Sequence, residues 1–337
     1  MSNSDRYGFI GLGVMGHHMA TNLQIYVTSQ NLAPLIVYNR TFSKTQDLTE
    51  IGAIAAKSLK EVVEYANIIF TSLANDDSVN QIYETLLKEH DQITDDNKKK
   101  VIFVDTSTIY PTTIAAIQEK LENVENRYLL YCPVVGPPVN AKAARLIIVT
   151  SGNQAAIDHV NHLLVPVLGR KTIHVGSDVR KAASFKLTVN FFIGNMLEAL
   201  SEGMTLAEKN GIEREKLLEI INLLFPDSPY GNYGTKILKE NFKQDIGFNI
   251  DNALKDVNHI RRLAKDSETH LPSADLLHKH LSYAKEHSPD ADQDWSCVVG
   301  SLRVGKCIPI VLQDYHLLVE KQQKNNRWRT FFEIILQ

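Results

Sequence analysis

One run of residues without proline, 180–211, constrains the fold of this chain more than any other segment. Leu, Met, Ala, Glu and Lys dominate its second half, so residue propensity favours a single helix that ends at Gly211 and is roughly 45 Å long. The polar residues Lys186 and Asn190 lie four positions apart and therefore share a face. Apolar residues occupy nearly all of the remaining circumference, which predicts a helix buried between other elements. They are Phe185, Leu187, Val189, Phe191, Phe192, Ile193, Met196, Leu197 and Leu200.

This helix is not expected to cross a membrane, because polar residues interrupt it well before the run of about eighteen apolar residues that a bilayer requires. The whole chain has 337 residues, which suits two domains. Its formal net charge of -3 gives no general reason to bind nucleic acid or an anionic membrane. The expected partners are therefore a small-molecule substrate and other protein subunits.

The three cysteines are odd in number and lack the spacing of metal ligands, which favours reduced thiols and a cytoplasmic location. They are Cys132, Cys297 and Cys307. No set of histidines has metal-ligand spacing either, and we expect no metal. The first predicted strand begins by about Tyr7, so no signal or transit peptide is expected.

A glycine-rich loop follows this first strand, residues 7–10, and precedes a helical pattern. In such a loop the first glycine permits a tight turn, the second lets the backbone approach a pyrophosphate, and the third lets the helix pack close to the strand. Glycines also occur in ordinary turns, but here the order is strand, loop and helix. The sequence therefore predicts a dinucleotide site formed by Gly11, Gly13, Val14, Met15 and Gly16.

The end of the second predicted strand, residues 35–38, indicates which dinucleotide is bound. No carboxylate stands there to bond the 2′-hydroxyl of NAD, and Asn39, Arg40 and Thr41 offer a charge and hydrogen-bond donors to a 2′-phosphate. NADP(H) is therefore expected in preference to NAD(H). The alternative is that Arg40 is an ordinary solvated arginine.

Strand and helix patterns then alternate through residues 68–72, 78–93, 101–105 and a helix after Pro111, which predicts a parallel, doubly wound sheet. Ligands bind outside the carboxyl ends of such strands, so residues 72–78 and 105–111 are candidate binding segments. Simple helix capping is the alternative explanation. The cofactor-binding candidates in these segments include Leu73, Ala74 and Ser78.

A helix near residues 154–168 and a strand at 172–175 complete the first predicted domain. We expect a Rossmann-type dinucleotide-binding domain over residues 1–177 and an all-helical substrate and dimerisation domain, built around the long helix, over residues 178–337. The second domain should contain further helices near residues 214–225, 252–264, 274–285 and 294–304.

Four motifs together resemble the β-hydroxyacid dehydrogenases over roughly residues 6–304. They are GLGVMGHHMATNL at 11–23, DTSTIYP at 105–111, KLTVN at 186–190 and LKDVNHI at 254–260. The resemblance implies a nicotinamide-dependent oxidoreductase of a small hydroxy acid, semialdehyde or related carbonyl compound. The related 6-phosphogluconate dehydrogenase shares the architecture but needs a much longer chain.

The resemblance also implies roles for individual residues. Thr108 contacts the nicotinamide end, Lys255 reaches the cofactor, and Asp256 lies in the substrate site. Lys186 is the catalytic lysine, which stabilises and protonates the substrate oxygen during hydride transfer, and Asn190 orients the substrate. Desolvation by Phe185 and its neighbours should favour the neutral amine of Lys186. A lysine whose stem merely packs at a domain junction, and a capping or interhelical amide for Asn190, are the structural alternatives.

The sequence departs from the family at the segment YCPVVGPP, residues 131–138, where the family has DAPVSGG. Val135 replaces the serine and Pro137 the second glycine, so a hydroxyl and an N–H that hold a substrate carboxylate are absent. We still assign Val135, Gly136 and Pro137 to the substrate site. An imine reductase of the same architecture and a redox-silent NADP-binding protein are the competing functions. The apolar tail, 305–337, is expected to pack either on its own domain or on a second subunit, and we expect a homodimer built on the helical domain.

Overall fold

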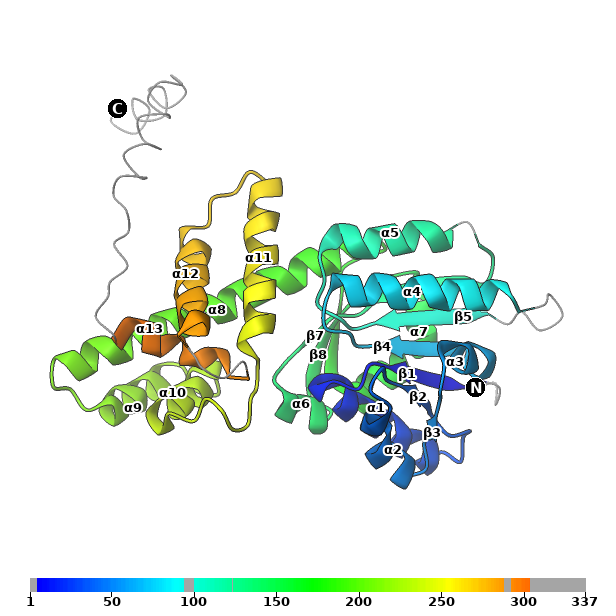
Figure 1. Cartoon of the computed structure of the whole chain (residues 1–337), viewed down its shortest axis with the longest axis horizontal. Coiled ribbons are helices and arrows are strands. Elements are labelled where there is room, and N and C mark those ends of the chain that lie inside the picture. The colour runs from blue at the N-terminus through cyan, green and yellow to red at the C-terminus, as the bar shows by residue number, and fades with distance from the viewer. Residues whose placement is uncertain (1–4, 94–99, 123, 288–291, 304–337) are drawn as a thin grey trace, which may run out of the picture.

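The computed structural model describes residues 5–93, 100–122, 124–287 and 292–303, and it consists of two lobes connected by the long helix α8 (Figure 1). The first lobe contains a sheet with helices on both faces, and the second lobe contains only helices. The predicted fold class is therefore confirmed. The boundary between residues 177 and 178 remains a prediction.

The sheet has the strand order β3-β2-β1-β4-β5-β6-β8-β7, with β9 paired to β8. The centre of the sheet consists of fully buried strands such as β5, residues 101–105, as expected for strands that are covered on both faces. The strands are β1 (Tyr7–Ile10), β2 (Ile36–Tyr38), β3 (Ile54–Ala55), β4 (Ile68–Thr71), β5 (Val101–Asp105), β6 (Arg127–Tyr131), β7 (Val134–Val135), β8 (Leu146–Gly152) and β9 (Gly169–His174).

The six strands from β3 to β6 are parallel, as the alternating pattern predicts. The remaining part of the sheet is mixed, because β8 is antiparallel to both β6 and β7 and parallel to β9. The first-lobe helices are α1 (Val14–Ser29), η1 (Phe42–Thr45), α2 (Gln46–Glu50), α3 (Leu59–Tyr65), α4 (Asp76–Asp91), α5 (Pro111–Glu122), α6 (Pro138–Lys142), α7 (Gln154–His162) and η3 (Leu163–Leu168).

The expectation of one helix over residues 154–168 is wrong in its second half. The regular helix α7 ends at His162, and Val165 within η3 has the extended backbone angles φ -135° and ψ 124°. Pro166 explains the difference, because proline pushes the residue before it out of the helical region. The following strand also starts earlier than expected, at Gly169.

Two apolar cores lie on the two faces of the sheet. One packs α1, α7 and η3 against residues such as Phe9 and Phe70, and the other packs α3, α4 and α5 against the opposite face. The first turns of α8 (Val179–Lys209) belong to the second of these cores, because Val179, Ala182 and Ala183 are fully buried within it. The long helix is therefore anchored in the first lobe before it enters the second.

The prediction of one uninterrupted helix over residues 180–211 is confirmed by α8, which begins after Asp178, whose carboxylate accepts a hydrogen bond from the Arg180 N–H. The prediction that α8 is buried on all sides is wrong. Phe185 is 38% exposed, Phe192 67% and Leu206 66%. These residues lie on a side of α8 that no other element of the described chain covers.

The second lobe packs its helices around the distal two thirds of α8, in a core that includes Leu197, Met204 and Trp295. The expected helices are present, with a short helical turn, η4, preceding the last one. Helix α10 is additional. The elements are α9 (Arg214–Leu224), α10 (Pro229–Lys239), α11 (Ile250–Asp266), α12 (Pro272–Glu286), η4 (Trp295–Val298) and α13 (Val299–Arg303).

Helix α10 escaped prediction because Gly231 and Gly234 weaken its helical propensity. Gly234 serves packing: a Cβ there would lie 2.3 Å from Cδ1 of Leu218 in α9, so a larger residue would require the Leu218 side chain to move.

The apolar tail after residue 304, with Cys307, and most of the polar connection at 91–100 lie outside the described residues. Within the described ranges, no helix is long and apolar enough to cross a membrane. The same ranges contain no group of three or more His, Cys, Asp or Glu side chains placed to hold a metal ion.

Candidate functional site

The glycine loop between β1 and α1 has the geometry that a dinucleotide requires. Gly11 has a φ of +95°, and a Cβ there would lie 2.2 Å from the Ser72 carbonyl oxygen. A Cβ on Gly16 would lie 2.0 Å from the Gly11 carbonyl oxygen, whereas no atom lies within 4 Å of the Cβ position of Gly13. Gly11 and Gly16 therefore permit close packing, and Gly13 leaves open space beside the loop.

The amino terminus of α1 is available to an anion. Gly13 is its N-cap, so no side chain caps the helix, and its first turn, which includes Val14 and Met15, contains no acidic residue. The helix dipole and the uncapped N–H groups favour a phosphate at this position. The residues present thus fit the pyrophosphate of a nicotinamide dinucleotide.

The three residues predicted to read the ribose follow β2 and differ in their surroundings. The Asn39 side chain accepts a hydrogen bond from the Leu12 N–H at 2.9 Å and donates one to the Thr41 carbonyl at 3.0 Å. Asn39 therefore connects the glycine loop to the turn after β2, and this contact uses one of its two amide N–H groups. Arg40 is exposed and makes no ion pair within the described part of the chain, so it remains the candidate for an anionic group.

Lys186 and Asn190 of α8 meet α11 at the junction of the two lobes. The Lys186 ammonium donates to Oδ1 of Asn190 at 2.9 Å, and Nδ2 of Asn190 donates to Oδ2 of Asp256 at 2.6 Å. Nζ of Lys255 lies 3.2 Å from Oδ1 of Asp256 and donates to the Thr108 carbonyl at 2.5 Å. Five residues predicted from the sequence are thus brought together in one continuous polar chain from α8 to the loop after β5.

The structure changes the expected position of Asp256. This side chain was assigned to the substrate site, but it is only 3% exposed and contacts Asn190 and Lys255. Asn190 consequently has both ends of its amide occupied. The interhelical amide bond and a substrate-orienting role are compatible, because the bond to Asp256 fixes which way the amide faces.

Burial lowers the pKa of Lys186 from its ordinary value to about 8. The carboxylate of Asp256 opposes this effect, and the positive charge of Lys255 adds to it. The lysine is 8% exposed, whereas the neighbouring Phe185 is 38% exposed. The pKa of Lys186 therefore shifts in the expected direction through burial, whereas the share of Phe185 in that burial remains a prediction.

A second buried carboxylate, Asp105 at the end of β5, organises the loops beside the polar contacts of Lys186, Asn190, Asp256 and Lys255. It accepts hydrogen bonds from the hydroxyl of Thr71 at 2.5 Å and from the Ser107 N–H at 2.9 Å. The Ser107 hydroxyl in turn accepts from the Leu73 N–H at 2.9 Å. The two segments predicted to bind the cofactor, after β4 and after β5, are thereby fixed to each other. Burial raises the pKa of Asp105 to about 6.

Ala74 is exposed and Ser78 half-buried, and both lie near the start of α4. The Asn75 side chain accepts a hydrogen bond from the Ser78 N–H at 2.9 Å. Helix capping, the alternative considered for this segment, therefore occurs. Capping does not exclude cofactor binding by Ala74 and the half-buried Leu73, which precede α4.

The altered segment runs from β7 through the start of α6. Val135 ends β7, Gly136 has a φ of +140°, and Pro137 is the exposed N-cap of α6. Because β7 pairs with β8 and α8 packs against β8, this segment lies on the side of the first lobe near the start of α8 (Figure 1). Its assignment to the substrate remains a prediction.

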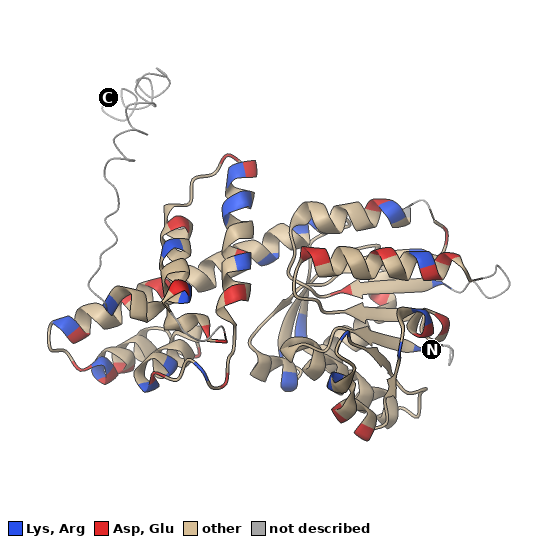
Figure 2. Cartoon of the chain, in the orientation of Figure 1, with Lys and Arg blue, Asp and Glu red and all other residues tan. Residues whose placement is uncertain are grey.

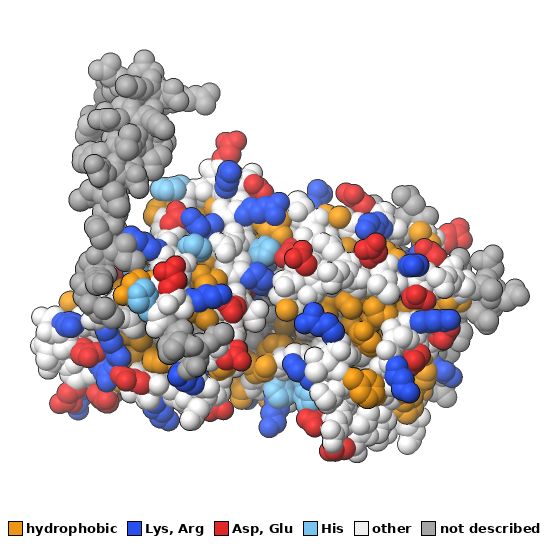
Figure 3. Space-filling model, in the orientation of Figure 1, with side chains coloured by type: hydrophobic (Ala, Val, Ile, Leu, Met, Phe, Trp, Pro, Cys, Tyr) orange, Lys and Arg blue, Asp and Glu red, His pale blue; other side chains and the backbone are white. Residues whose placement is uncertain are grey.

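Sequence reasoning missed several polar residues at the same junction. His259 of α11 lies 3.0 Å from Asp76 of α4, and the Tyr110 hydroxyl donates to Asp266 at 2.6 Å. The spacing of the polar residues along α11 was the available signal, but it cannot reveal what they contact. Figure 3 shows charged and apolar side chains side by side where the lobes meet.

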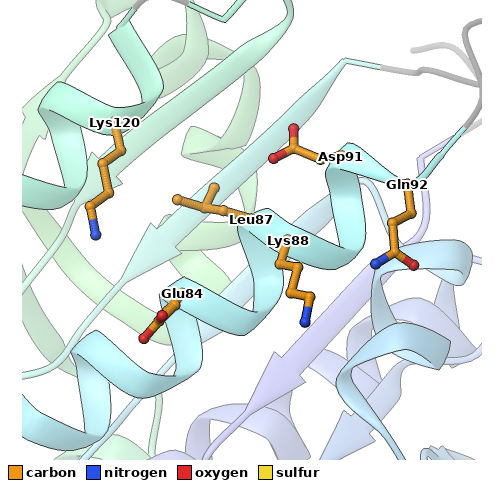
Figure 4. A pocket seen from close by; sticks show the side chains of 6 residues that line it. All are labelled: Glu84, Leu87, Lys88, Asp91, Gln92 and Lys120. Carbon is orange, nitrogen blue, oxygen red and sulfur yellow. The ribbon is translucent and has the colours of Figure 1, made fainter.

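A hollow of about 440 Å³ lies elsewhere, between the carboxyl-terminal half of α4 and α5 (Figure 4). Its lining consists of Glu84, Leu87, Lys88, Asp91, Gln92 and Lys120. Ligands of doubly wound sheets bind at the carboxyl ends of the strands, where the helices begin. This hollow is at the opposite end of α4 from Asp76, so we do not assign it to the site.

Comparison with known proteins identifies the families that the two lobes resemble. Residues 6–176 match the family described as the NAD binding domain of 6-phosphogluconate dehydrogenase, and residues 181–302 match the family described as NAD-binding of NADP-dependent 3-hydroxyisobutyrate dehydrogenase. The chain is 34% identical over 302 residues to an uncharacterized oxidoreductase, YfjR, of Bacillus subtilis, covering 89% of this chain and 98% of that protein.

Two further comparisons extend the likeness. The chain is 27% identical over 300 residues to glyoxylate/succinic semialdehyde reductase 1 of Arabidopsis thaliana, covering 89% of this chain and 99% of that protein. The solved structure of 3-hydroxyisobutyrate dehydrogenase from Mycobacterium tuberculosis with L-serine superimposes with a TM-score of 0.73 at 22% identity, covering 89% of this chain and 99% of that chain. The structural likeness shows the fold.

The charge balance around Lys186 can be tested directly. Because the Asp256 carboxylate raises the pKa of Lys186 against the effect of burial, Asp256→Asn should lower this pKa below about 8. NMR titration of the ¹³C-dimethylated lysines, with Lys186→Met to assign the signal, measures the midpoint. Asp251→Asn, an exposed change on the same helix, is the matched control. An unchanged midpoint in Asp256→Asn would contradict the effect of the Asp256 charge on the pKa of Lys186.

Proposed function

The chain belongs to the β-hydroxyacid dehydrogenase family, and we propose that it is an NADP-dependent reductase of a small carbonyl compound that uses Lys186 as its general acid. The buried, hydrogen-bonded lysine at the junction of the lobes is the observation that carries the proposal. The same enzyme in the opposite direction oxidises the corresponding alcohol, with Lys186 as the general base.

NADPH, when bound, supplies the hydride that is added to the carbonyl carbon of the substrate. The residues proposed to hold it are those of the glycine loop, Arg40 at the ribose, and Thr108 with Lys255 at the nicotinamide end. The negative charge that develops on the substrate oxygen must be neutralised, and the Lys186 ammonium provides the proton. A pKa near 8 suits both directions, because both forms of the amine are populated near neutral pH.

Asn190 supports the chemistry by fixing the Lys186 ammonium through its Oδ1 atom. The other two N–H groups of the ammonium have no hydrogen-bond partner among the residues that the structure describes, so they can face a substrate oxygen. Asp256 and Lys255 form an ion pair at 3.2 Å and largely neutralise each other. The Lys186 ammonium therefore faces the substrate beside a pair that has no net charge.

The activity is tested by a panel of semialdehydes, ketoacids and cyclic imines with NADPH, followed at the nicotinamide absorbance. Lys186→Met should lower kcat by about 100-fold or more, the range expected for a general acid, and should leave NADPH binding nearly unchanged. Lys181→Met, an exposed change on the same helix, is the matched control. In the wild type, kcat/KM for reduction should fall as the pH rises through about 8, because the amine loses its proton.

Full activity of Lys186→Met would remove the lysine from the mechanism. Turnover of cyclic imines alone would favour the imine reductase. Failure of every substrate, with tight NADPH binding, would favour a redox-silent NADP-binding protein.

Cofactor preference rests on Arg40, whose exposed guanidinium follows β2 where no carboxylate stands. Arg40→Asp should weaken NADPH binding by roughly 10-fold to 100-fold and affect NADH far less, since only NADPH carries the 2′-phosphate. Fluorescence titration with each cofactor measures both affinities. Arg170→Asp, which makes the same charge change at an exposed position of β9, is the control. Equal losses for both cofactors in Arg40→Asp would exclude the assignment.

We also propose that the chain forms a homodimer through the helical lobe. Besides Phe192 and Leu206 of α8, helix α9 leaves Ile220 56%, Leu223 75% and Leu224 68% exposed. So many large apolar side chains on one lobe are typical of a surface that is covered by another subunit.

Light scattering at micromolar concentration should give twice the chain mass of 37.9 kDa, and the double change Phe192→Asp and Leu223→Asp should give the monomer mass. Ile25→Asp, which places the same charge at a 58% exposed apolar position of the first lobe, should leave the mass unchanged. A wild-type monomer would contradict the proposal.

A further inference from the structure

Helix α11 carries a polar stripe that faces the first lobe. Lys255, His259, Arg262 and Asp266 follow one another at intervals of four, three and four residues, which places them on one face of the helix. A different face of α11, with Ala253, Val257, Ile260 and Ala264, is apolar and buried, and α11 packs against α8 and α12. Both signs of charge appear along α11 in Figure 2. The stripe is therefore held by a helix whose position is fixed by the core of the second lobe.

Three members of this stripe surround Tyr110, which belongs to the loop after β5 and is 2% exposed. The imidazole of His259 stacks on the Tyr110 ring, with centroids 5.5 Å apart and an interplanar angle of 26°. The guanidinium of Arg262 lies 4.0 Å from the ring centroid, and the Tyr110 hydroxyl donates to Asp266 at 2.6 Å. One aromatic side chain of the first lobe is thus held by the second lobe through its ring and its hydroxyl group.

Asp76, at the start of α4, completes the contact from the side of the first lobe. Its Oδ1 atom accepts hydrogen bonds from the Tyr110 N–H at 2.9 Å and from the Thr113 hydroxyl at 2.6 Å. Its Oδ2 atom lies 3.0 Å from Nε2 of His259. A single carboxylate therefore connects α4, the loop after β5, the first turn of α5 and α11.

The loop that is held in this way also carries Thr108. The Thr108 carbonyl accepts a hydrogen bond from Lys255. Two residues further along the chain, the Tyr110 N–H donates a hydrogen bond to Asp76. The backbone of the loop is thus tied on both sides of Ile109, and in both cases the tie leads to the stripe of α11. The position of Thr108 consequently depends on contacts between the two lobes as well as on the sheet.

We propose that the α11 stripe is an interdomain clasp and that His259 is its central positioning residue, which orders the Thr108 loop against the nicotinamide end of the cofactor. This inference rests on the proposed function for its effect on turnover. His259 does not touch the reacting atoms in this scheme. It acts through Asp76 and Tyr110, so its removal should disorder the nicotinamide end and leave the phosphate-binding loop intact.

The clasp requires only a neutral donor at position 259. Burial lowers the pKa of His259, although the carboxylate of Asp76 opposes the shift, and the imidazole is therefore mainly neutral at pH 7. A neutral imidazole with its proton on Nε2 donates one hydrogen bond to Asp76. A glutamine side chain can make the same donation, and alanine cannot.

The test compares His259→Ala, His259→Gln and Arg261→Ala by two measurements, steady-state turnover and the emission of bound NADPH, which reports how ordered the nicotinamide ring is. His259→Ala should lower kcat by roughly 10-fold to 100-fold, the effect of a small misplacement, with an NADPH dissociation constant close to that of the wild type and a weaker emission from the bound cofactor. His259→Gln should recover most of both signals. Arg261→Ala removes a neighbouring ion pair with Asp275 on α12 and should behave as the wild type.

Wild-type kcat and emission in His259→Ala would overturn the clasp, as would a glutamine variant as impaired as the alanine variant. If His259→Ala does not fold, Asp76→Asn takes its place, because it keeps an acceptor for Tyr110 and weakens the bond to His259. The emission does not depend on turnover. If the wild type binds NADPH but reduces no carbonyl compound, the proposed function fails, and the emission of the variants still decides whether the clasp exists.

Discussion

The geometry of the candidate site depends on the two contacts that the carboxylate of Asp256 makes, with Asn190 and with Lys255. A carboxylate that is only 3% exposed is stable when it is paired and hydrogen-bonded, and here Lys255 supplies the charge and Asn190 the hydrogen bond. The bond to Asn190 turns the amide so that its oxygen faces Lys186. Because the carboxylate is already paired with Lys255, it cannot fully offset the burial of Lys186. The shared carboxylate therefore opposes, without cancelling, the burial that lowers the pKa of Lys186 to about 8.

This chain of contacts requires that the two lobes keep a fixed relation, and α8 provides it. Its first turns lie in the core of the first lobe, with Val179 and Ala183 fully buried, and its later turns carry Leu197 and Met204 into the core of the second. Lys186 and Asn190 fall between these two anchors. The helix α11 then packs on α8 and reaches back to the first lobe through Lys255 and His259. The junction is thus held at two places, one apolar and one polar.

Patterns of local sequence predicted most of the elements and the residues that meet at the junction. The glycine loop, the long helix and the pair Lys186 and Asn190 depend on spacing along the chain, and spacing is visible in a sequence. Burial depends on neighbours that are distant in sequence, so the exposure of Phe192 and the contacts of Asp256 could not be predicted. The irregular segment after His162 could have been, since Pro166 is itself a signal. His259 and Tyr110 are 149 residues apart in the chain, and only the fold reveals that they stack.

The segment after β6, which we propose lines the substrate site, has few groups that could hold an anion. Pro133, Pro137 and Pro138 have no N–H, so the stretch from 133 to 138 offers only the N–H groups of Val134, Val135 and Gly136. The side chains of this stretch contribute no donor. Beside Lys186, the charge of Lys255 is already balanced by Asp256. An anionic group on the substrate would therefore meet few donors and no unpaired cation other than Lys186 among these residues. If this segment lines the substrate site as proposed, recognition there depends mainly on shape and apolar contact, which favours a carbonyl compound whose other end is uncharged.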